Sequence, residues 1–159
     1  MKKFNIVLFE PEIPENTGNI ARTCVGFNAR LNLIKPYGFI LSNSRVKRAG
    51  LDYWKNLELC EYENWLDFEN KLPQNSKIWL FTKFSNISLG ETNFNYSENQ
   101  EIFFVFGKES KGLPNSIKNK YYNHVKINMN ENIRSYNLSN SVAIAAFEFH
   151  KQTNFIFLK

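Results

Sequence analysis

Apolar runs constrain the fold of this chain more than any other feature. They cover residues 4–9, 31–34, 78–81 and 102–106, and a weaker fifth run covers 125–129. Several of these runs are continuous rather than alternating, which is typical of strands covered on both faces in a parallel sheet. Helical patterns fall between them, at 16–27, 64–72 and 114–121. This alternation predicts an α/β fold, a mostly parallel sheet flanked by helices, in one domain spanning 1–159.

The last helical pattern, from Leu138 to about Gln152, is unusually apolar. One stripe of this helix consists of Leu138, Val142, Ala145 and Phe149. Ile144 and Phe147 point away from that stripe, so the later turns are apolar nearly all round. A helix of this kind is buried on several sides. A subunit interface and deep insertion into the same chain are both open explanations.

The charge and the composition of the chain indicate which kinds of binding partner to expect. The net charge is +5 and the pI is about 9.2. A basic balance favours an acidic partner such as nucleic acid, although a charge of this size can also serve solubility alone. The two cysteines, Cys24 and Cys60, sit among apolar residues and give neither a disulfide framework nor metal-ligand spacing. His124 and His150 are isolated, so we expect no zinc site.

The first residues of the chain do not match a targeting signal. Met1, Lys2 and Lys3 precede only six mostly apolar residues before Glu10. This run is too short for a signal peptide or a membrane span. We therefore expect a cytoplasmic protein without a membrane partner.

Two candidate loops follow the first and fourth apolar runs. The first loop, 10–19, leads into a helix for which Asn16 is the expected N-cap. Arg22 lies about 200° around that helix from Ile20, off the packing stripe, and faces solvent or a ligand. The second loop, 106–114, holds Gly107 and Gly112 with two lysines between them, which suggests a backbone that approaches a ligand. It does not match a P-loop, and the chain contains no G-x-G-x-x-G.

The third candidate segment, 134–141, reads Arg-Ser-Tyr-Asn-Leu-Ser-Asn-Ser and opens the last helix. Side-chain oxygens ahead of an apolar-periodic run mark a helix start. A helix N-terminus presents free backbone N–H groups and suits a polar or anionic ligand. Because ligands bind beyond the carboxyl ends of strands in open α/β sheets, we expect the three loops to form one site.

Together the three loops resemble the SPOUT class of trefoil-knotted RNA methyltransferases, and more narrowly its TrmL (YibK-type) tRNA wobble-nucleotide 2′-O-methyltransferases. The segments that carry the resemblance are 7–14, 16–22, 48–53, 106–114 and 134–141. The resemblance covers essentially the whole chain, at minimal length and without an added RNA-binding domain. The chain departs from the family pattern at Asn128, Ile133 and Phe147, where relatives often carry Pro, a small polar residue and, in some cases, Tyr.

The resemblance implies S-adenosyl-L-methionine bound in a C-terminal trefoil knot and a homodimer whose sites draw on both subunits. By position, the cofactor contacts of the family fall on Leu80, Gly107, Ile127 and Ser135, with Thr82, Glu109, Gly112 and Leu138 nearby. The family assigns the activating role to the arginine that is Arg22 here. The implied substrate is the wobble cytidine or uridine in the anticodon arm of tRNA, with leucine isoacceptors suggested.

Several polar residues are candidates for holding RNA. Asn16 and Arg134 are expected to position the nucleotide. Arg45, Lys47 and Arg48, followed by Tyr53 and Trp54, form a basic and aromatic patch that contacts RNA or is simply a solvated loop. Two rival functions stay open: 2′-O-methylation of ribosomal RNA, and an RNA-binding module of this fold without activity.

Overall fold

The computed structural model describes residues 4–41 and 53–158. Within this part, six strands form one sheet in the order β3-β2-β1-β5-β4-β6, and all five neighbouring pairs are parallel. The strands are β1 (Phe4–Phe9), β2 (Arg30–Ile34), β3 (Glu58–Tyr62), β4 (Ser76–Phe81), β5 (Glu101–Gly107) and β6 (His124–Val125). The predicted parallel α/β architecture is confirmed.

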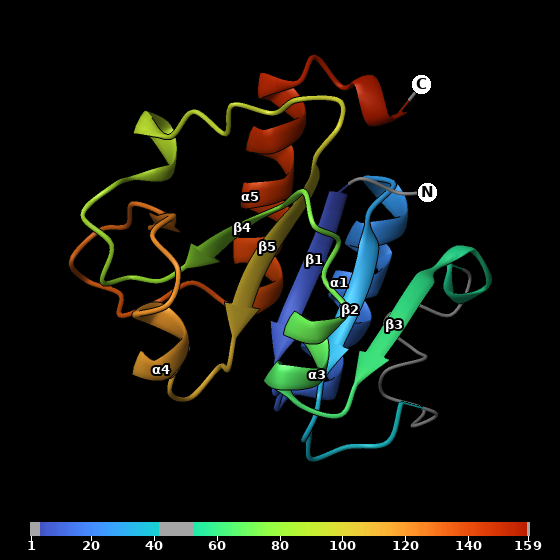
Figure 1. Ribbon diagram of the computed structural model, residues 1–159. Helices are drawn as coiled ribbons and strands as arrows, with labels where there is room; N and C mark the ends of the chain where they lie inside the picture. Colours follow the sequence, from blue (N-terminus) through green and yellow to red (C-terminus); the bar gives the residue numbers. More distant parts are fainter. Residues whose placement is uncertain (1–3, 42–52, 159) are drawn as a thin grey trace.

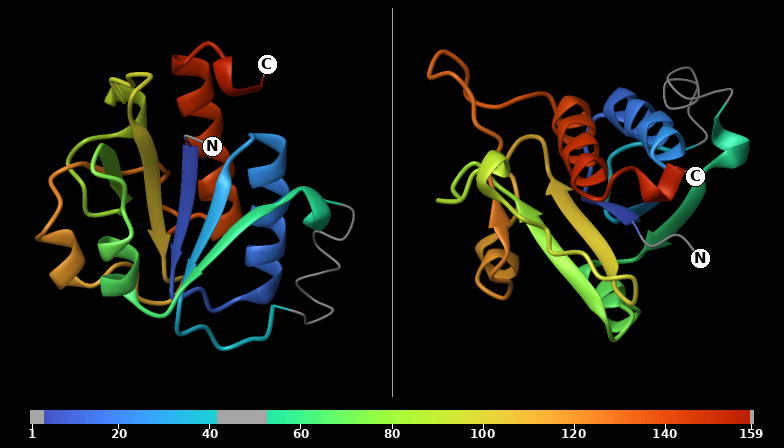
Figure 2. Two further views of the ribbon diagram at one scale, coloured as in Figure 1. Left: turned by 45° about the vertical axis from the view of Figure 1, so that its right-hand side comes forward. Right: turned by 90° about the horizontal axis from the view of Figure 1, so that it is seen from above.

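The helices cover both faces of this sheet (Figures 1 and 2). They are α1 (Pro14–Gly26), α3 (Trp65–Asn70), α4 (Asn115–Lys118) and α5 (Leu138–Gln152), with short 3₁₀ helices η1 (Trp54–Asn56), η2 (Leu89–Glu91) and η3 (Ile156–Leu158). Helices α1 and α5 lie side by side on one face, and α3 lies on the other.

Strand β1 shows why continuous apolar runs accompany this arrangement. All six of its residues are buried. Phe4, Ile6 and Leu8 belong to the core beneath α1 and α5, whereas Val7 and Phe9 belong to the core beneath α3 and α4. Because successive side chains point to opposite faces, a strand covered on both faces is apolar at nearly every position. The exception in β1 is Asn5, which is buried and donates its side-chain amide to the Ile102 carbonyl over 3.3 Å.

Three boundaries predicted for strands and helices were wrong. The run 125–129 forms only β6, His124–Val125, since the next residue, Lys126, exchanges backbone hydrogen bonds with the loop of Ile87 and Leu89 instead of with β4. The pattern 114–121 yields one turn, α4, and 64–72 yields the shorter α3. Strand β3 had no apolar run to reveal it, because Glu58 and Glu61 interrupt it at the edge of the sheet.

The start of α1 also differs from expectation. The helix begins at Pro14, and its N-cap is Ile13, so Asn16 lies inside the first turn and is not the cap. Proline suits the first helical turn because its φ is already helical and it has no N–H to leave unpaired. This shift buries Asn16, which is 5% exposed, and frees its side chain to reach other loops.

Helix α5 packs along one stripe and leaves another uncovered. Val142, Ala145 and Phe149 are fully buried against the sheet and α1. Ile144 and Phe147 remain 38% and 52% exposed. Insertion into its own chain therefore covers only part of this apolar helix.

The order of the strands reverses at the middle of the sheet. Strand β1 pairs with β2 on one side and with β5 on the other, and Phe9 at its end lies opposite both Ile34 and Gly107. In open α/β sheets, ligand sites form beyond the carboxyl ends of strands at such a reversal. The loops after β1 and β5 are neighbours there.

Residues 4–41 and 53–158 contain neither a membrane-spanning helix nor a metal-binding cluster. No helix in these ranges is long and apolar enough to cross a bilayer. No group of His, Cys, Asp or Glu side chains in the same ranges could hold a metal ion.

Candidate functional site

Reciprocal hydrogen bonds join the loop after β1 to the loop after β5. The backbone N–H and the hydroxyl of Ser110 both donate to the Glu12 carboxylate, each over 2.8 Å. These two bonds hold the pKa of Glu12 below its usual value. Two positions before this pair in each loop, Lys108 forms an ion pair with Glu10, and the hydrogen bond to Glu10 raises the pKa of Lys108.

Glu109 completes the connection between these loops. Its carboxylate accepts hydrogen bonds from the backbone N–H groups of Glu12 at 2.9 Å and Ile13 at 3.2 Å. It accepts a third bond, of 3.3 Å, from the side-chain amide of Asn16. The Glu109 carboxylate thus accepts hydrogen bonds from N–H groups just before the N-terminus of α1, where a negative charge is favourable. The loop after β5 is fixed to the start of α1.

Asn16 carries the connection on to the third segment. Its amide oxygen accepts a 2.9 Å hydrogen bond from the side chain of Asn137. Asn137 is the N-cap of α5, because its own side-chain oxygen accepts from the Ser139 N–H at 2.9 Å and from the Ser139 hydroxyl at 2.6 Å. The expectation that the three loops meet is confirmed, and Glu109, Asn16 and Asn137 are the side chains that join them.

The two glycines have different roles. Gly107 has φ +128°, and a Cβ placed on it would lie 2.4 Å from the carbonyl oxygen of Phe9. The backbone of Gly107 therefore approaches β1 too closely to leave room for any side chain. Gly112 has φ +66° and donates its N–H to the Lys108 carbonyl over 2.9 Å, which closes the loop.

The other expected cofactor residues lie at the carboxyl edge of β4 and along the segment that leads to α5. Leu80 is fully buried inside β4, whereas Thr82 follows this strand and donates its N–H to Val125. Ile127 and Leu138 are partly buried against the core, and Ser135 is exposed.

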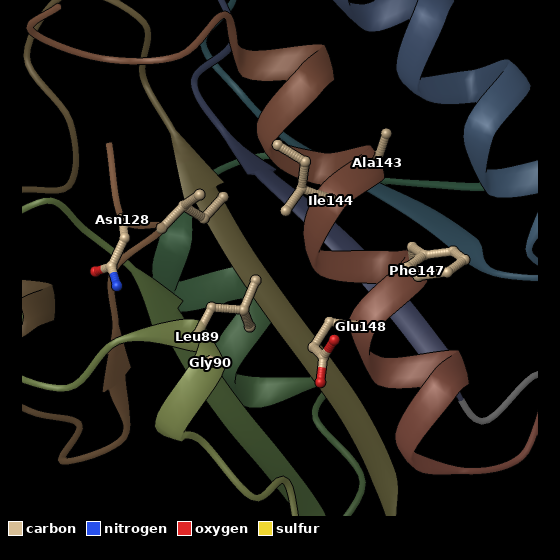
Figure 3. Close-up of a pocket in the computed structure, with 8 residues that line it drawn as sticks. Leu89, Gly90, Asn128, Ala143, Ile144, Phe147 and Glu148 are labelled. Atoms are coloured by element: carbon tan, nitrogen blue, oxygen red, sulfur yellow. The ribbon is translucent and has the colours of Figure 1, made fainter. Parts of the chain in front are cut away.

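A hollow of about 590 Å³ borders this segment. Its walls come from η2, from the stretch after β6 and from the exposed side of α5 (Figure 3). Leu89, Gly90, Ile127, Asn128, Ala143, Ile144, Phe147 and Glu148 line it. Among the residues that line the hollow, only Ile127 is also an expected cofactor residue. The hollow therefore lies next to the expected cofactor residues.

Arg22 is exposed on α1, as predicted from its place off the packing stripe. Its Cζ lies 4.8 Å from the centre of the Tyr53 ring. Within the described ranges, Arg22 takes part in no ion pair. An aromatic face holds the flat side of a guanidinium and leaves its N–H edges available.

The remaining candidates for RNA contact fall in different places. Arg134, the first residue of the third segment, is exposed. Asn16 is buried and both ends of its amide are engaged, which is the geometry of a link between loops. Arg45, Lys47 and Arg48 lie outside the described residues.

Sequence reasoning did not identify Glu12, Ser110 or Asn137 as parts of this site. Asn137 could have been found, since an Asn one residue before Leu138-Ser139 has the pattern of an N-cap. The pairing of Glu12 with Ser110 depends on how β1 and β5 are aligned, and no local pattern reports that alignment.

Known proteins resemble this chain in sequence and in fold. The model of the SpoU rRNA methylase family matches residues 3–147. A candidate tRNA (cytidine(34)-2′-O)-methyltransferase of Mycoplasma pneumoniae is 45% identical over 152 residues, which are 95% of this chain and 92% of that protein. A solved structure concerned with the 2-OH methylation of C/U34 on tRNA is 37% identical, with a TM-score of 0.88 over 96% of this chain and 97% of that chain. An AdoMet-bound rRNA methyltransferase of Sinorhizobium meliloti shares the fold, with 17% identity and a TM-score of 0.84 over 94% of this chain and 56% of that one.

Proposed function

Because the chain belongs to the SpoU rRNA methylase family, we propose that it is an S-adenosyl-L-methionine-dependent tRNA 2′-O-methyltransferase. Its substrate is the ribose 2′-hydroxyl of the wobble nucleotide, a cytidine or uridine in the anticodon arm. One observation carries the proposal: the three segments that resemble the methyltransferases meet through Glu109, Asn16 and Asn137.

The residues at the carboxyl edge fit an adenosyl group. Ile127 and Leu138 present partly buried apolar surface, which suits a purine. Ser135 adds an exposed hydroxyl for a ribose or an amino acid end. The cofactor-binding set that we propose is Leu80, Thr82, Gly107, Glu109, Gly112, Ile127, Ser135 and Leu138. In this set Glu109 holds the loop after β5 in place, since its carboxylate already accepts three hydrogen bonds.

When bound, S-adenosyl-L-methionine supplies the activated methyl group. The task of this chain is to align the 2′-oxygen and to stabilise the charge that develops on it. A guanidinium keeps its proton in proteins and is a poor proton acceptor, so we do not assign Arg22 the role of base. Arg22 instead donates hydrogen bonds to the 2′-oxygen and to a neighbouring phosphate, and the proton leaves to phosphate or water.

We also propose that the protein is a homodimer. Ile144 and Phe147 stay exposed on α5, and an apolar strip of this kind fits a second copy of the chain. In such a homodimer each site draws on both subunits. We further propose one domain over residues 1–159, a C-terminal trefoil knot in which α5 threads a loop, and a cytoplasmic location.

RNA contact is assigned to Arg134 and to the basic patch of Arg45, Lys47 and Arg48. Asn16, which is buried and bonded at both ends of its amide, is proposed to position the nucleotide indirectly, as the link between the loops. The preferred substrates are leucine isoacceptors. Methylation of ribosomal RNA is the second candidate, favoured by the name of the family, while a silent RNA-binding module is the third.

A methylation assay tests the function. The purified protein is incubated with labelled S-adenosyl-L-methionine and either total tRNA or ribosomal RNA, and the modified nucleotide is mapped by mass spectrometry. We expect 2′-O-methylation at position 34 of tRNA and none in ribosomal RNA. Label in ribosomal RNA alone, or no label with either RNA, would contradict the proposal.

Arg22→Ala tests the role of the arginine. We expect turnover to fall by about 10²–10³-fold, the usual effect of losing one donor to a developing oxyanion, with cofactor affinity unchanged by calorimetry. Arg22→Lys should also be poor, because a point charge cannot make a bidentate contact. Lys71→Ala, on the exposed side of α3, is the control and should retain full turnover.

A further inference from the structure

An exposed aromatic ring lies between two lysines beyond the carboxyl end of β4. Phe84 is 71% exposed. The Nζ atom of Lys83 lies 5.3 Å from the centre of its ring, and the Nζ atom of Lys118 lies 5.1 Å from the same point. Lys83 belongs to the loop after β4 and Lys118 to the end of α4, so two separate elements bring the three side chains together. We refer to Lys83, Phe84 and Lys118 as the Phe84 cluster.

The turn that presents Phe84 is braced by hydrogen bonds. The N–H of Phe84 donates to the Thr82 hydroxyl over 3.3 Å, and the N–H of Ser85 donates to the Thr82 carbonyl over 3.2 Å. Ser85 is 6% exposed, and its hydroxyl donates to the carbonyl of His124 in β6 over 2.9 Å. The exposure of Phe84 is thus a consequence of a fixed turn.

Lys118 is held from the other side by the same strand. Nε2 of His124 lies 2.9 Å from the Lys118 carbonyl oxygen, which can only accept, so the ring donates. One residue earlier, Ile117 is buried in the core beneath α3 and α4. Strand β6 therefore fixes both elements of the Phe84 cluster relative to each other.

The two lysines have no acidic partner in the part of the chain that the structure describes. Lys35, Lys71, Lys108, Lys120 and Lys151 each form an ion pair there, whereas Lys83 and Lys118 do not. A cation over an exposed ring is held only weakly, so both ammonium groups can leave the ring for a phosphate. Unpaired cations around an exposed ring complement a polyanion that carries π-faces.

We propose that the Phe84 cluster binds an unpaired base and the adjoining phosphates of the substrate RNA, next to the nucleotide that is methylated. This inference rests on the proposed function, because Thr82, two residues before Phe84, belongs to the proposed cofactor set. Base stacking on an aromatic ring with lysines on the backbone is the general mode of single-strand recognition. A base-paired stem keeps its bases stacked inside the helix, so the cluster selects a loop.

Phe84→Ala tests the stacking contact. We expect the affinity for an anticodon stem–loop RNA to fall about 5- to 100-fold, the range found when one stacking aromatic residue is removed. Affinity for S-adenosyl-L-methionine should not change, and Phe84→Trp should restore RNA binding. The control is Leu158→Ala, which removes a side chain of 44% exposure from η3, at the other end of the molecule (Figure 1). Wild-type affinity in Phe84→Ala would overturn the proposal.

A second pair of variants tests the lysines. Lys83→Ala with Lys118→Ala should lower the slope of log affinity against log salt by about 1.4, as expected for two lost contacts to single-stranded phosphate. Lys71→Ala with Lys151→Ala removes the same charge elsewhere and should leave the slope unchanged. Equal slopes in the two double variants would contradict phosphate binding at this cluster.

Two further measurements separate the alternatives. If Phe84→Ala changed the sedimentation of the protein, the ring would be a contact between copies, and the RNA assignment would fall. If the variant lost affinity equally for the stem–loop and for a duplex of the same stem, selection of unpaired bases would be excluded. A wild-type protein that bound the stem–loop through Phe84 but methylated no tRNA would refute the proposed function alone.

Discussion

The side-chain amide of Asn137 donates a 2.9 Å hydrogen bond to the amide oxygen of Asn16, a residue 121 positions away in the chain. Asn16 lies in the first turn of α1, and Asn137 caps α5. One bond therefore aligns the starts of the two helices that share a face of the sheet. On the other side of Asn16, the bond to Glu109 extends this alignment to the loop after β5.

Asn137→Ala should destabilise the protein by about 1–2 kcal/mol, because it removes an N-cap and the bond to Asn16 together. Asn137→Ser separates the two effects, since serine caps a helix nearly as well as asparagine but is too short to reach Asn16. Urea unfolding of both variants measures the difference. If the serine variant were as unstable as the alanine variant, the bond to Asn16 would carry all of the effect, and equal stability of serine and wild type would show that it contributes nothing.

The parallel sheet was predictable because its central strands must be apolar on both faces. The run in β1 and the one in β5 are continuous for this reason. An edge strand need not be apolar on both faces. Strand β3, which contains two glutamates, therefore shows no apolar run. The length of β6 was overestimated from the apolar run 125–129. An apolar residue after Val125, Ile127, is partly buried against the core without being part of a strand.

The candidate site was predictable only in its parts. The position of Arg22 off the helix stripe and the helix start before Leu138 are local patterns, which sequence periodicity can reveal. The bonds of Glu109 depend instead on the register that places Phe9 opposite Gly107. Register follows from the packing of the whole sheet. Neither the partners of the Glu109 carboxylate nor the close approach of Gly107 to Phe9 could therefore be derived from the motif.

Gly107→Ala should be among the most damaging single changes in this chain. The residue has a φ of +128°, and the new Cβ would lie 2.4 Å from the Phe9 carbonyl oxygen, in the backbone of the central strand. We expect a loss of about 3 kcal/mol or more, or no cooperative unfolding at all.

Gly26→Ala is the matched control for this change, because a Cβ there meets no atom within 4 Å. It should alter the free energy of unfolding by about 1 kcal/mol at most. Denaturant titration followed by circular dichroism compares the two. A cooperative transition of Gly107→Ala at the wild-type midpoint would show that the strand ends can separate without cost.

Tyr53 should matter for turnover through its contact with Arg22. The guanidinium carbon lies 4.8 Å from the ring centre. Removing the ring in Tyr53→Leu should lower kcat about 2- to 5-fold, the equivalent of an exposed cation–π contact, without changing cofactor affinity. Tyr53→Phe keeps the aromatic face and should retain wild-type kcat. A low kcat in Tyr53→Phe would indicate instead that the phenolic hydroxyl is the group that matters.

His150 should make the fold sensitive to mild acid. The side chain is fully buried, its Nδ1 lies 2.9 Å from the Ala146 carbonyl, and the rings of Phe4, Phe27 and Phe149 surround it. Burial lowers the pKa of His150 below its ordinary value of 6.5. The folded protein thus resists protonation, while the unfolded chain takes up a proton near pH 6.5.

The stabilising effect of a neutral His150 is therefore complete above pH 6.5 and is lost as the pH falls from there towards the lowered pKa of the folded state. The free energy of unfolding should fall by up to about 1.4 kcal/mol per pH unit in this window, since one proton is linked to unfolding. Measuring it between pH 7.5 and 5.5 avoids the range where most carboxylates titrate. His150→Leu should remove this slope even if the variant is less stable at every pH, because leucine binds no proton. A slope that persisted in the leucine variant would assign the acid sensitivity to another group.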